Sequence, residues 1–135
     1  MTVFGDANEV YRYIGGIFEQ AVADPELGEQ LAASGAVLQL HYTDPDSLIT
    51  VDMPQHKVYM GSKDLPADLK PTVEMFMKAD VGHQFWLGKV NISAALSKGE
   101  MRAKGPVPKI LQLIPVAQQL FPRYEQMMKE SGRVT

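Results

Sequence analysis

The sequence predicts an α+β fold, with a single five-stranded, mainly antiparallel sheet covered by helices. One observation is that apolar and polar residues alternate with the period of a strand in five runs: 36–42, 48–53, 57–60, 72–78 and 100–104. The first three runs are joined by short turns, which favours an antiparallel meander. The other observation is that segments outside these runs repeat apolar residues at spacings of three and four, the period of an amphipathic helix.

Two helices are predicted before the first strand. Asp6 followed by Glu9 is an N-terminal capping pattern, and residues 24–26 (Asp-Pro-Glu) combine a cap, a proline at the first helical position and an acidic first turn. Gly15-Gly16 interrupts the first helix, although each glycine costs about 1 kcal/mol relative to alanine. Either another element approaches the helix closely at these glycines, or the helix has a hinge there.

The alternation also predicts which side chains face the core. In the last run, Glu100, Arg102 and Lys104 lie on one face, and apolar residues lie on the other. The apolar faces of four runs consist of Leu38, Leu40, Tyr42, Ile49, Val51, Met53, Val73, Met75, Met77, Met101 and Ala103. The chain has 8 methionines, whose flexible side chains suit either a loosely packed interior or one that accepts a variable guest.

Length, charge and cysteine content limit the class of protein. A chain of 135 residues suits one domain, 1–135, that buries about two thirds of its unfolded-state surface. The absence of cysteine excludes disulfides, thiol catalysis and thiolate metal sites. The formal net charge is −3 with both signs scattered, so we expect no nucleic-acid partner. Because no signal-peptide pattern and no bilayer-spanning run is present, we expect a cytoplasmic location.

Residues that could carry out catalysis or bind a metal form no recognisable motif. His41, His56 and His83 have no partner at ligand spacing, so we expect neither a metal site nor a cofactor. His83 is expected at the surface or at a helix cap, with a pocket mouth as the alternative. No serine lies in a Gly-x-Ser-x-Gly elbow, and Asp44 and Asp46 belong to a turn. We therefore expect a protein that is not an enzyme.

Glycines divide the C-terminal half into short elements. Asp80 is expected to cap a helix that ends at Gly88, and a second helical piece is expected at 92–96. After Gly105 the chain becomes apolar, and the segment 110–121 is apolar around most of its circumference. A helix of this kind is either enclosed by protein on all sides or faces a ligand.

Three features of this half occur together: a Gly88-Lys89 step, a helix ending in Ser97-Lys98-Gly99, and residues 99–105 (Gly-Glu-Met-Arg-Ala-Lys-Gly) before an apolar helix. In this combination the chain resembles the sterol carrier protein 2 (SCP2) sterol-binding domain family. Members of that family have a Gly-Lys step, an alanine-rich helix, Gly-Lys-Leu-Lys-Ile-x-Gly and a leucine-rich helix. The resemblance covers the last half of the chain, and the first half agrees in the order of its elements only.

The resemblance implies an SCP2-like fold with an apolar tunnel between the sheet and the helices. It also implies non-catalytic binding and carriage or presentation of lipids, such as fatty acids, acyl-CoA, sterol-like or isoprenoid molecules, with at most transient membrane contact. On this basis we expect the lipid to contact the following residues: Met75, Phe85, Trp86, Met101, Ile110, Leu113, Ile114, Ala117, Leu120 and Phe121.

Two alternatives stay open at this point. The first is an accessory or interaction module that assists a lipid- or quinone-metabolising partner enzyme, with the tunnel filled by its own side chains. The second is a small enzyme acting on a lipid, which would need a buried polar group with a shifted pKa in the tunnel.

The same segment also carries a prediction about motion. Pro108, Pro115 and Pro122 are seven residues apart and are expected to break the segment 110–121 into short pieces. A wall with incomplete backbone hydrogen bonding opens at lower cost than a continuous helix. We therefore expect this segment to be the movable wall of the tunnel.

Overall fold

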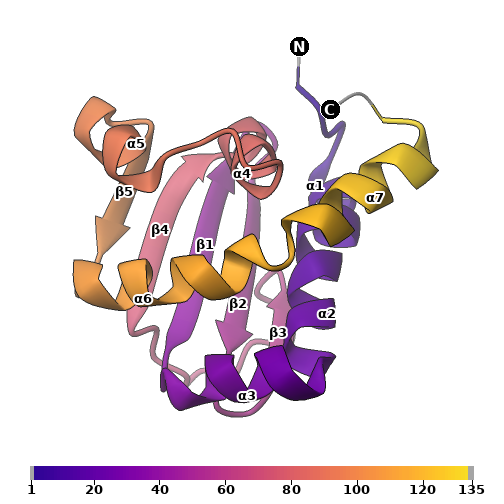
Figure 1. The fold of residues 1–135 in the computed structure, drawn as a ribbon. Coiled ribbons are helices and arrows are strands. Elements are labelled where there is room, and N and C mark those ends of the chain that lie inside the picture. The colour runs from indigo at the N-terminus through magenta and orange to yellow at the C-terminus, as the bar shows by residue number, and fades with distance from the viewer. Residues whose placement is uncertain (1, 134–135) are drawn as a thin grey trace.

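The computed structural model describes residues 2–133 and contains a sheet with the strand order β3-β2-β1-β4-β5 (Figure 1). The strands are β1 (Val37–Thr43), β2 (Ser47–Asp52), β3 (Lys57–Met60), β4 (Val73–Lys78) and β5 (Met101–Lys104). The pairs β1–β2, β2–β3 and β4–β5 are antiparallel, and β1–β4 is parallel. The predicted α+β fold with a five-stranded, mainly antiparallel sheet is confirmed.

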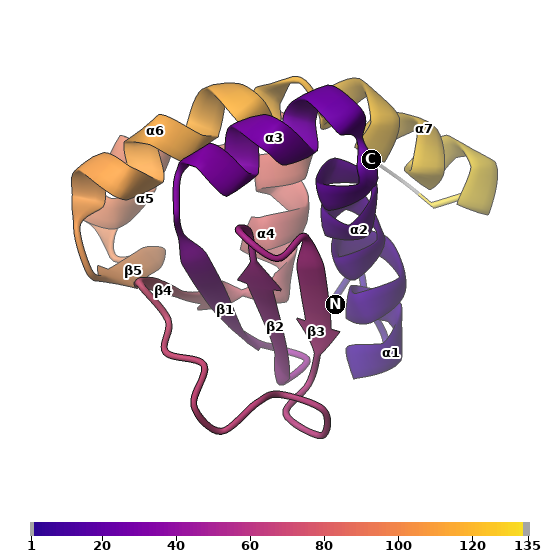
Figure 2. The same cartoon turned by 90° about the horizontal axis from the view of Figure 1, so that it is seen from below.

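The helical elements precede, interrupt and follow the strands. They are α1 (Ala7–Val10), a π-helical turn η1 (Tyr11–Gly15), α2 (Gly16–Ala23), α3 (Pro25–Ala33), α4 (Ala79–Trp86), α5 (Ile92–Lys98), α6 (Val107–Gln118) and α7 (Phe121–Ser131). In Figure 2, α3 and α6 lie across one face of the sheet, and the connection 61–72 runs on the other side. We call the face of the sheet toward α3 and α6 the inner face and the opposite one the outer face.

The predicted apolar face of the sheet is the face that packs against the helices. All of its residues are buried except Ala103, which is half-buried. Thr50 and Asp52, which alternate with them on β2, are also buried, at 1% and 8% exposure. Their burial was not predicted, because the alternation of a strand marks its apolar face and does not show what covers the other face; Thr50, for example, accepts a hydrogen bond from the Gln39 side chain of β1 at 3.1 Å.

The N-terminal helices begin as predicted. The Asp6 carboxylate accepts a hydrogen bond from the Glu9 backbone N–H at 3.0 Å, and Asp24 accepts from Leu27 at 2.9 Å. At Gly15, any added Cβ would collide with the side chain of Met60 on β3. The close approach of another element, rather than a hinge alone, therefore accounts for the glycine pair.

The end of the chain differs from the predicted series of short pieces. Pro108 lies in the first turn of α6 and Pro122 in the first turn of α7, where a proline has no helical hydrogen bond to break. Of the three prolines, Pro115 alone lies inside a helix, so the 12-residue α6 lacks one backbone hydrogen bond, to the carbonyl of Leu111. The predicted division at three prolines was wrong because two of them start helices.

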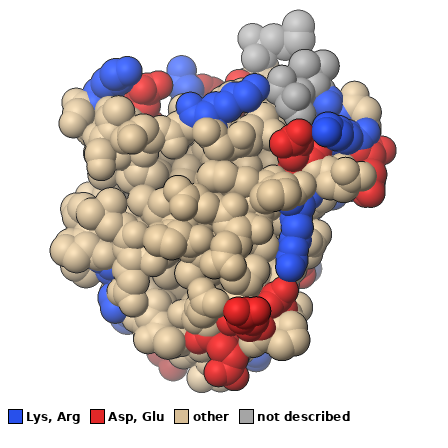
Figure 3. Space-filling view, in the orientation of Figure 1, with Lys and Arg blue, Asp and Glu red and all other residues tan. Residues whose placement is uncertain are grey.

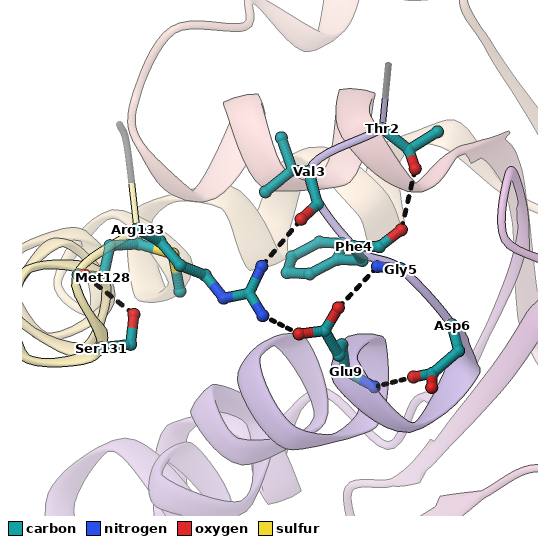
Figure 4. A network of polar contacts seen from close by, with 9 residues as sticks. All are labelled: Thr2, Val3, Phe4, Gly5, Asp6, Glu9, Met128, Ser131 and Arg133. Atoms are coloured by element: carbon teal, nitrogen blue, oxygen red, sulfur yellow. Dashed lines mark hydrogen bonds and ion pairs between the residues drawn. The ribbon is translucent and has the colours of Figure 1, made fainter.

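The two ends of the described chain are held together at α7 (Figure 4). Arg133 donates a hydrogen bond to the Val3 carbonyl oxygen at 2.7 Å and forms an ion pair with Glu9. Its guanidinium carbon also lies 4.7 Å from the ring centroid of Tyr13. Asp80 was predicted to cap α4, but the cap is Lys78, and Asp80 lies in the first turn of the helix. There its carboxylate accepts a hydrogen bond from the Val3 backbone N–H at 2.9 Å. These contacts fix α7 against the N-terminal segment.

Candidate functional site

An apolar cavity of about 90 Å³ lies between the inner face of the sheet and the helices. Its walls come from β1, β4 and β5 and from helices α2 to α6, and no Asp, Glu, Lys, Arg or His is among the described residues that line it. Small-molecule sites usually measure about 300–1,000 Å³. A guest as large as a fatty acid therefore requires the walls to move apart, and the tunnel itself stays a prediction.

Most of the predicted site residues meet at this cavity. Nine of the ten line it, and Phe121 is the exception. The Phe121 ring lies outside the lining, with its centroid 5.4 Å from that of Phe85 and 6.1 Å from that of Trp86. Their contact with a lipid stays a prediction.

The cavity also contains residues that the sequence assigned to no site. They come from the first half of the chain and include Phe18, Ala21, Leu31, Leu38, Leu40 and Tyr42. For Leu38, Leu40 and Tyr42 the sequence held one signal, the alternation of β1, which placed them on the apolar face of a strand. Whether that face borders a packed core or a cavity depends on the helices that cover it, so the strand pattern alone could not reveal it.

Helix α6 forms the outer wall of the cavity. Its inward residues include Ile110, Leu113 and Ala117, whereas Val107 and Leu111 on the opposite side are 43% and 45% exposed. Figure 3 shows a broad area with few charged side chains on the face that α6 crosses. The helix is thus apolar toward the cavity and largely uncharged toward the outside.

Polar contacts fasten both ends of this wall. Near its start, the Lys109 ammonium donates to the Ser34 carbonyl oxygen at 2.7 Å, which ties α6 to the end of α3. Beyond its end, Arg123 of α7 pairs with Asp24 at 2.9 Å. The backbone N–H of Leu27 and the Arg123 side chain hold the pKa of the Asp24 carboxyl below its ordinary value. Any outward motion of the start of α6 therefore has to break the Lys109–Ser34 hydrogen bond.

His83 is buried, which corrects the predicted surface or capping position. Its residue exposure is 0%, and Nδ1 lies 2.8 Å from the Tyr124 hydroxyl of α7. Burial lowers the pKa of His83, because the charged imidazolium would lose its hydration. The side of α4 that carries His83 is covered by α7 and by Phe4, whose ring centroid lies 5.5 Å away. Neither covering element could be inferred from the local pattern of α4.

A second hollow, of about 370 Å³, lies on the outer face of the sheet along β1, β4 and β5. Here His41 contacts Glu74 at 3.0 Å and stacks on Phe76 with 4.4 Å between ring centroids. The Arg102 guanidinium carbon lies 5.2 Å from the same Phe76 ring. The polar groups of this outer hollow are thus paired with one another and partly exposed to water, so they do not need a ligand as a partner. We therefore assign the candidate site to the inner cavity.

Groups that could hold a metal are not gathered at either hollow. Across residues 2–133, no cluster of three or more His, Cys, Asp or Glu side chains is placed to hold a metal ion.

Within the same residues, no helix is both long enough and apolar enough to cross a membrane. Of the residues lining the inner cavity, Tyr42 is the one with a titratable side chain in the described part of the chain.

The sheet, the helices and the cavity define an α+β domain with an apolar cavity between the sheet and the helices. Comparison with solved structures shows that this is the sterol carrier protein 2 fold. The sterol carrier protein domain 2 of Helicoverpa armigera matches with a TM-score of 0.65 and 16% identity, over 84% of this chain and 89% of that one. Sequence comparison adds nothing further, since no family model and no curated protein sequence matches the chain.

Two other similar structures are relevant to function. Sterol carrier protein 2 of Aedes aegypti, solved in complex with palmitate, matches with a TM-score of 0.54 and 19% identity, over 82% of this chain and 93% of that one. The ubiquinone synthesis protein UbiJ-SCP2 matches with a TM-score of 0.57 and 14% identity, over 82% of this chain and 89% of that one. At these identities the likeness establishes the fold.

Proposed function

We propose that the protein binds lipids in the apolar cavity and carries or presents them without catalysis. The ligands in this proposal are fatty acyl chains, sterol-like or isoprenoid molecules. The observation that carries it is the cavity itself, which lies between sheet and helices and is lined by no charged residue among those described. Similarity of fold to a protein solved with palmitate supports it. A cytoplasmic location with at most transient membrane contact belongs to the same proposal.

The energetics of apolar burial favour a carrier. An acyl chain of about sixteen carbons gains roughly 13 kcal/mol on burial, at about 0.8 kcal/mol per methylene. Association costs about 4–15 kcal/mol, which removes much of this gain. Net affinity is then moderate, and apolar contact alone discriminates poorly between chains, as suits a protein that must also release its ligand.

Entry of a lipid into the 90 Å³ cavity requires one wall to move, and α6 is the wall best suited to it. Gly105, with φ of 106°, joins α6 to the sheet in a conformation that other residues rarely adopt. Pro115 removes one backbone hydrogen bond from the helix. The next helix, α7, is held by Arg133 and by the Tyr124–His83 contact. We therefore propose that α6 swings outward while α7 stays in place.

The test overfills the cavity from α6. Leu113→Trp adds volume on the inward side, and Leu111→Trp is the matched control because Leu111 is 45% exposed on the outward side of the same helix. Titration with a fluorescent fatty acid, followed by the emission of the ligand, should show at least about 10-fold weaker binding for Leu113→Trp. Leu111→Trp should bind as the parent does, and both should retain the circular dichroism spectrum of the parent. Equal binding by both variants would contradict the proposal.

A second candidate is an accessory module that assists a lipid- or quinone-metabolising enzyme, with the cavity filled by its own side chains. The exposed Val107 and Leu111 on a largely uncharged face favour it, because apolar surface patches commonly mark protein interfaces. Similarity of fold to UbiJ-SCP2 is consistent with it. If neither the parent nor either tryptophan variant binds any lipid at micromolar concentration, this second function replaces the first.

A further inference from the structure

Two side chains with an oxygen or nitrogen atom line the otherwise apolar cavity. Tyr42 of β1 is 4% exposed, and Trp86 of α4 is 3% exposed. Every other lining residue described is aliphatic, phenylalanine, methionine or glycine. Tyr42 and Trp86 are therefore the lining residues whose side chains carry a hydrogen-bond donor, a hydroxyl and an indole N–H.

Neither group has a hydrogen-bond partner in the described part of the chain. Among the described residues, one side-chain nitrogen or oxygen is both fully buried and without a partner, and this is His83 Nε2. The Tyr42 oxygen and Trp86 Nε1 also lack a partner, so each of them must keep some accessible surface. Buried hydroxyl and indole N–H groups are nearly always hydrogen-bonded in folded proteins. Two donors without a protein partner, on residues that line one apolar cavity, point to an atom of the ligand as their partner.

Tyr42 and Trp86 meet the cavity at the same helix, α4. The Tyr42 ring packs against Gly82, where an added Cβ would lie 2.8 Å from Tyr42 Cε1. Gly82 and Trp86 are four residues apart on α4, which places them on the same face of the helix, one turn from each other. His83, which is bonded to Tyr124, is the residue next to Gly82 on α4, so the polar groups of the interior gather beside this helix.

We infer that the cavity beside α4 binds an uncharged oxygen, a carbonyl or hydroxyl, of a lipid that lies in it. The inference rests on the proposed lipid-binding function and specifies its ligand class. Burial raises the pKa of Tyr42, so its hydroxyl stays a neutral donor. No described lysine, arginine or histidine lines the cavity, and burial of an ionised carboxylate without a counter-charge is strongly unfavourable. Fatty alcohols, ketones, esters and sterol-like alcohols then bind oxygen-first, whereas a fatty acid leaves its carboxylate outside.

The chain contains 1 tryptophan, so the indole N–H gives a single cross-peak in a ¹⁵N–¹H spectrum. We would titrate the full chain with 1-hexadecanol, 1-hexadecene and palmitate, which share a sixteen-carbon chain and differ at one end. A hydrogen bond to the hexadecanol oxygen should move the indole proton downfield, well beyond any change caused by hexadecene or palmitate. Equal indole shifts with hexadecanol and hexadecene would overturn the inference.

Matched tyrosine variants give a second measurement. Tyr42→Phe should weaken hexadecanol binding about 3- to 10-fold, measured by competition with a fluorescent acyl probe, and leave hexadecene binding unchanged. Tyr59→Phe on β3 loses the same atom away from the cavity and should change neither. If Tyr42→Phe keeps the parent's preference for hexadecanol, the inference fails while lipid binding stands. If none of the three lipids binds to the parent, the proposed function and the inference fail together.

Discussion

The hydrogen bond between His83 and Tyr124 gives the sharpest prediction about stability. The two groups meet at 2.8 Å, both residues are 0% exposed, and His83 Nε2 already lacks a partner within residues 2–133. Tyr124→Phe removes one oxygen and leaves His83 with no hydrogen bond on either ring nitrogen. A buried polar group left unpaired costs about 1–3 kcal/mol. We expect the free energy of unfolding to fall by that amount.

Urea unfolding at pH 7.5 measures this loss, and a double-mutant cycle separates it from packing effects. His83→Phe should also destabilise the protein, because it leaves the Tyr124 hydroxyl buried and unpaired. The double variant removes both polar groups and should lose at least about 1 kcal/mol less than the sum of the single losses. Tyr59→Phe, at a half-buried position on β3, serves as the control. Additivity within about 0.5 kcal/mol would refute the assigned hydrogen bond.

Two further predictions concern pH and the start of α6. Burial holds the pKa of His83 below 6.5, its ordinary value, so below pH 6.5 the unfolded chain binds a proton that the folded protein excludes, and stability falls as pH drops. Between pH 7.5 and 5.5, His83 contributes up to about 1.4 kcal/mol to this loss of unfolding free energy. Urea unfolding at the two pH values should therefore show a smaller loss for His83→Phe than for the parent. An equal loss would contradict the prediction. Gly105→Ala should cost at least about 2 kcal/mol, because φ is 106° and the new Cβ would collide with the Thr72 carbonyl oxygen. Gly99→Ala, at φ of 77° with open space around it, should cost about 1 kcal/mol, and equal melting temperatures for the two variants would argue against this assignment.

The strands were predictable from the sequence because their signals are local, whereas the strand order and the parallel β1–β4 pair were not predicted, because they depend on contacts between distant segments. Alternation identified the strands and their inner faces, and capping residues such as Asp6 and Asp24 placed the helix starts. The chain was expected to break at Pro108, Pro115 and Pro122, but Pro108 and Pro122 lie in the first turns of helices. From the sequence, such a proline cannot be told from one inside a helix until the helix boundary is known. Pro115 alone interrupts the helix of which it is part.

The candidate site was predictable only in part, because its composition depends on contacts between distant segments. The resemblance concentrated the prediction on the last half of the chain, and nine of the ten residues named there line the cavity. Tyr42 entered the prediction only as a core residue of a strand. His83 was misplaced because Phe4 and Tyr124, which cover it, are 79 and 41 residues away in the sequence. The size of the cavity follows from how all these side chains pack, and no single pattern encodes it.

The methionines of the chain provide the most direct test of the central claim, that a lipid enters the cavity behind α6. Met53, Met75, Met77 and Met101 line the cavity, whereas Met60, Met127 and Met128 do not. In a methyl NMR titration of the methionine-labelled protein with 1-hexadecanol, we expect the four cavity methyl signals to shift saturably and the signals of Met60, Met127 and Met128 to stay in place. Shifts confined to Met60 and Met127, or no shift in any methyl signal, would show that the lipid does not enter the cavity.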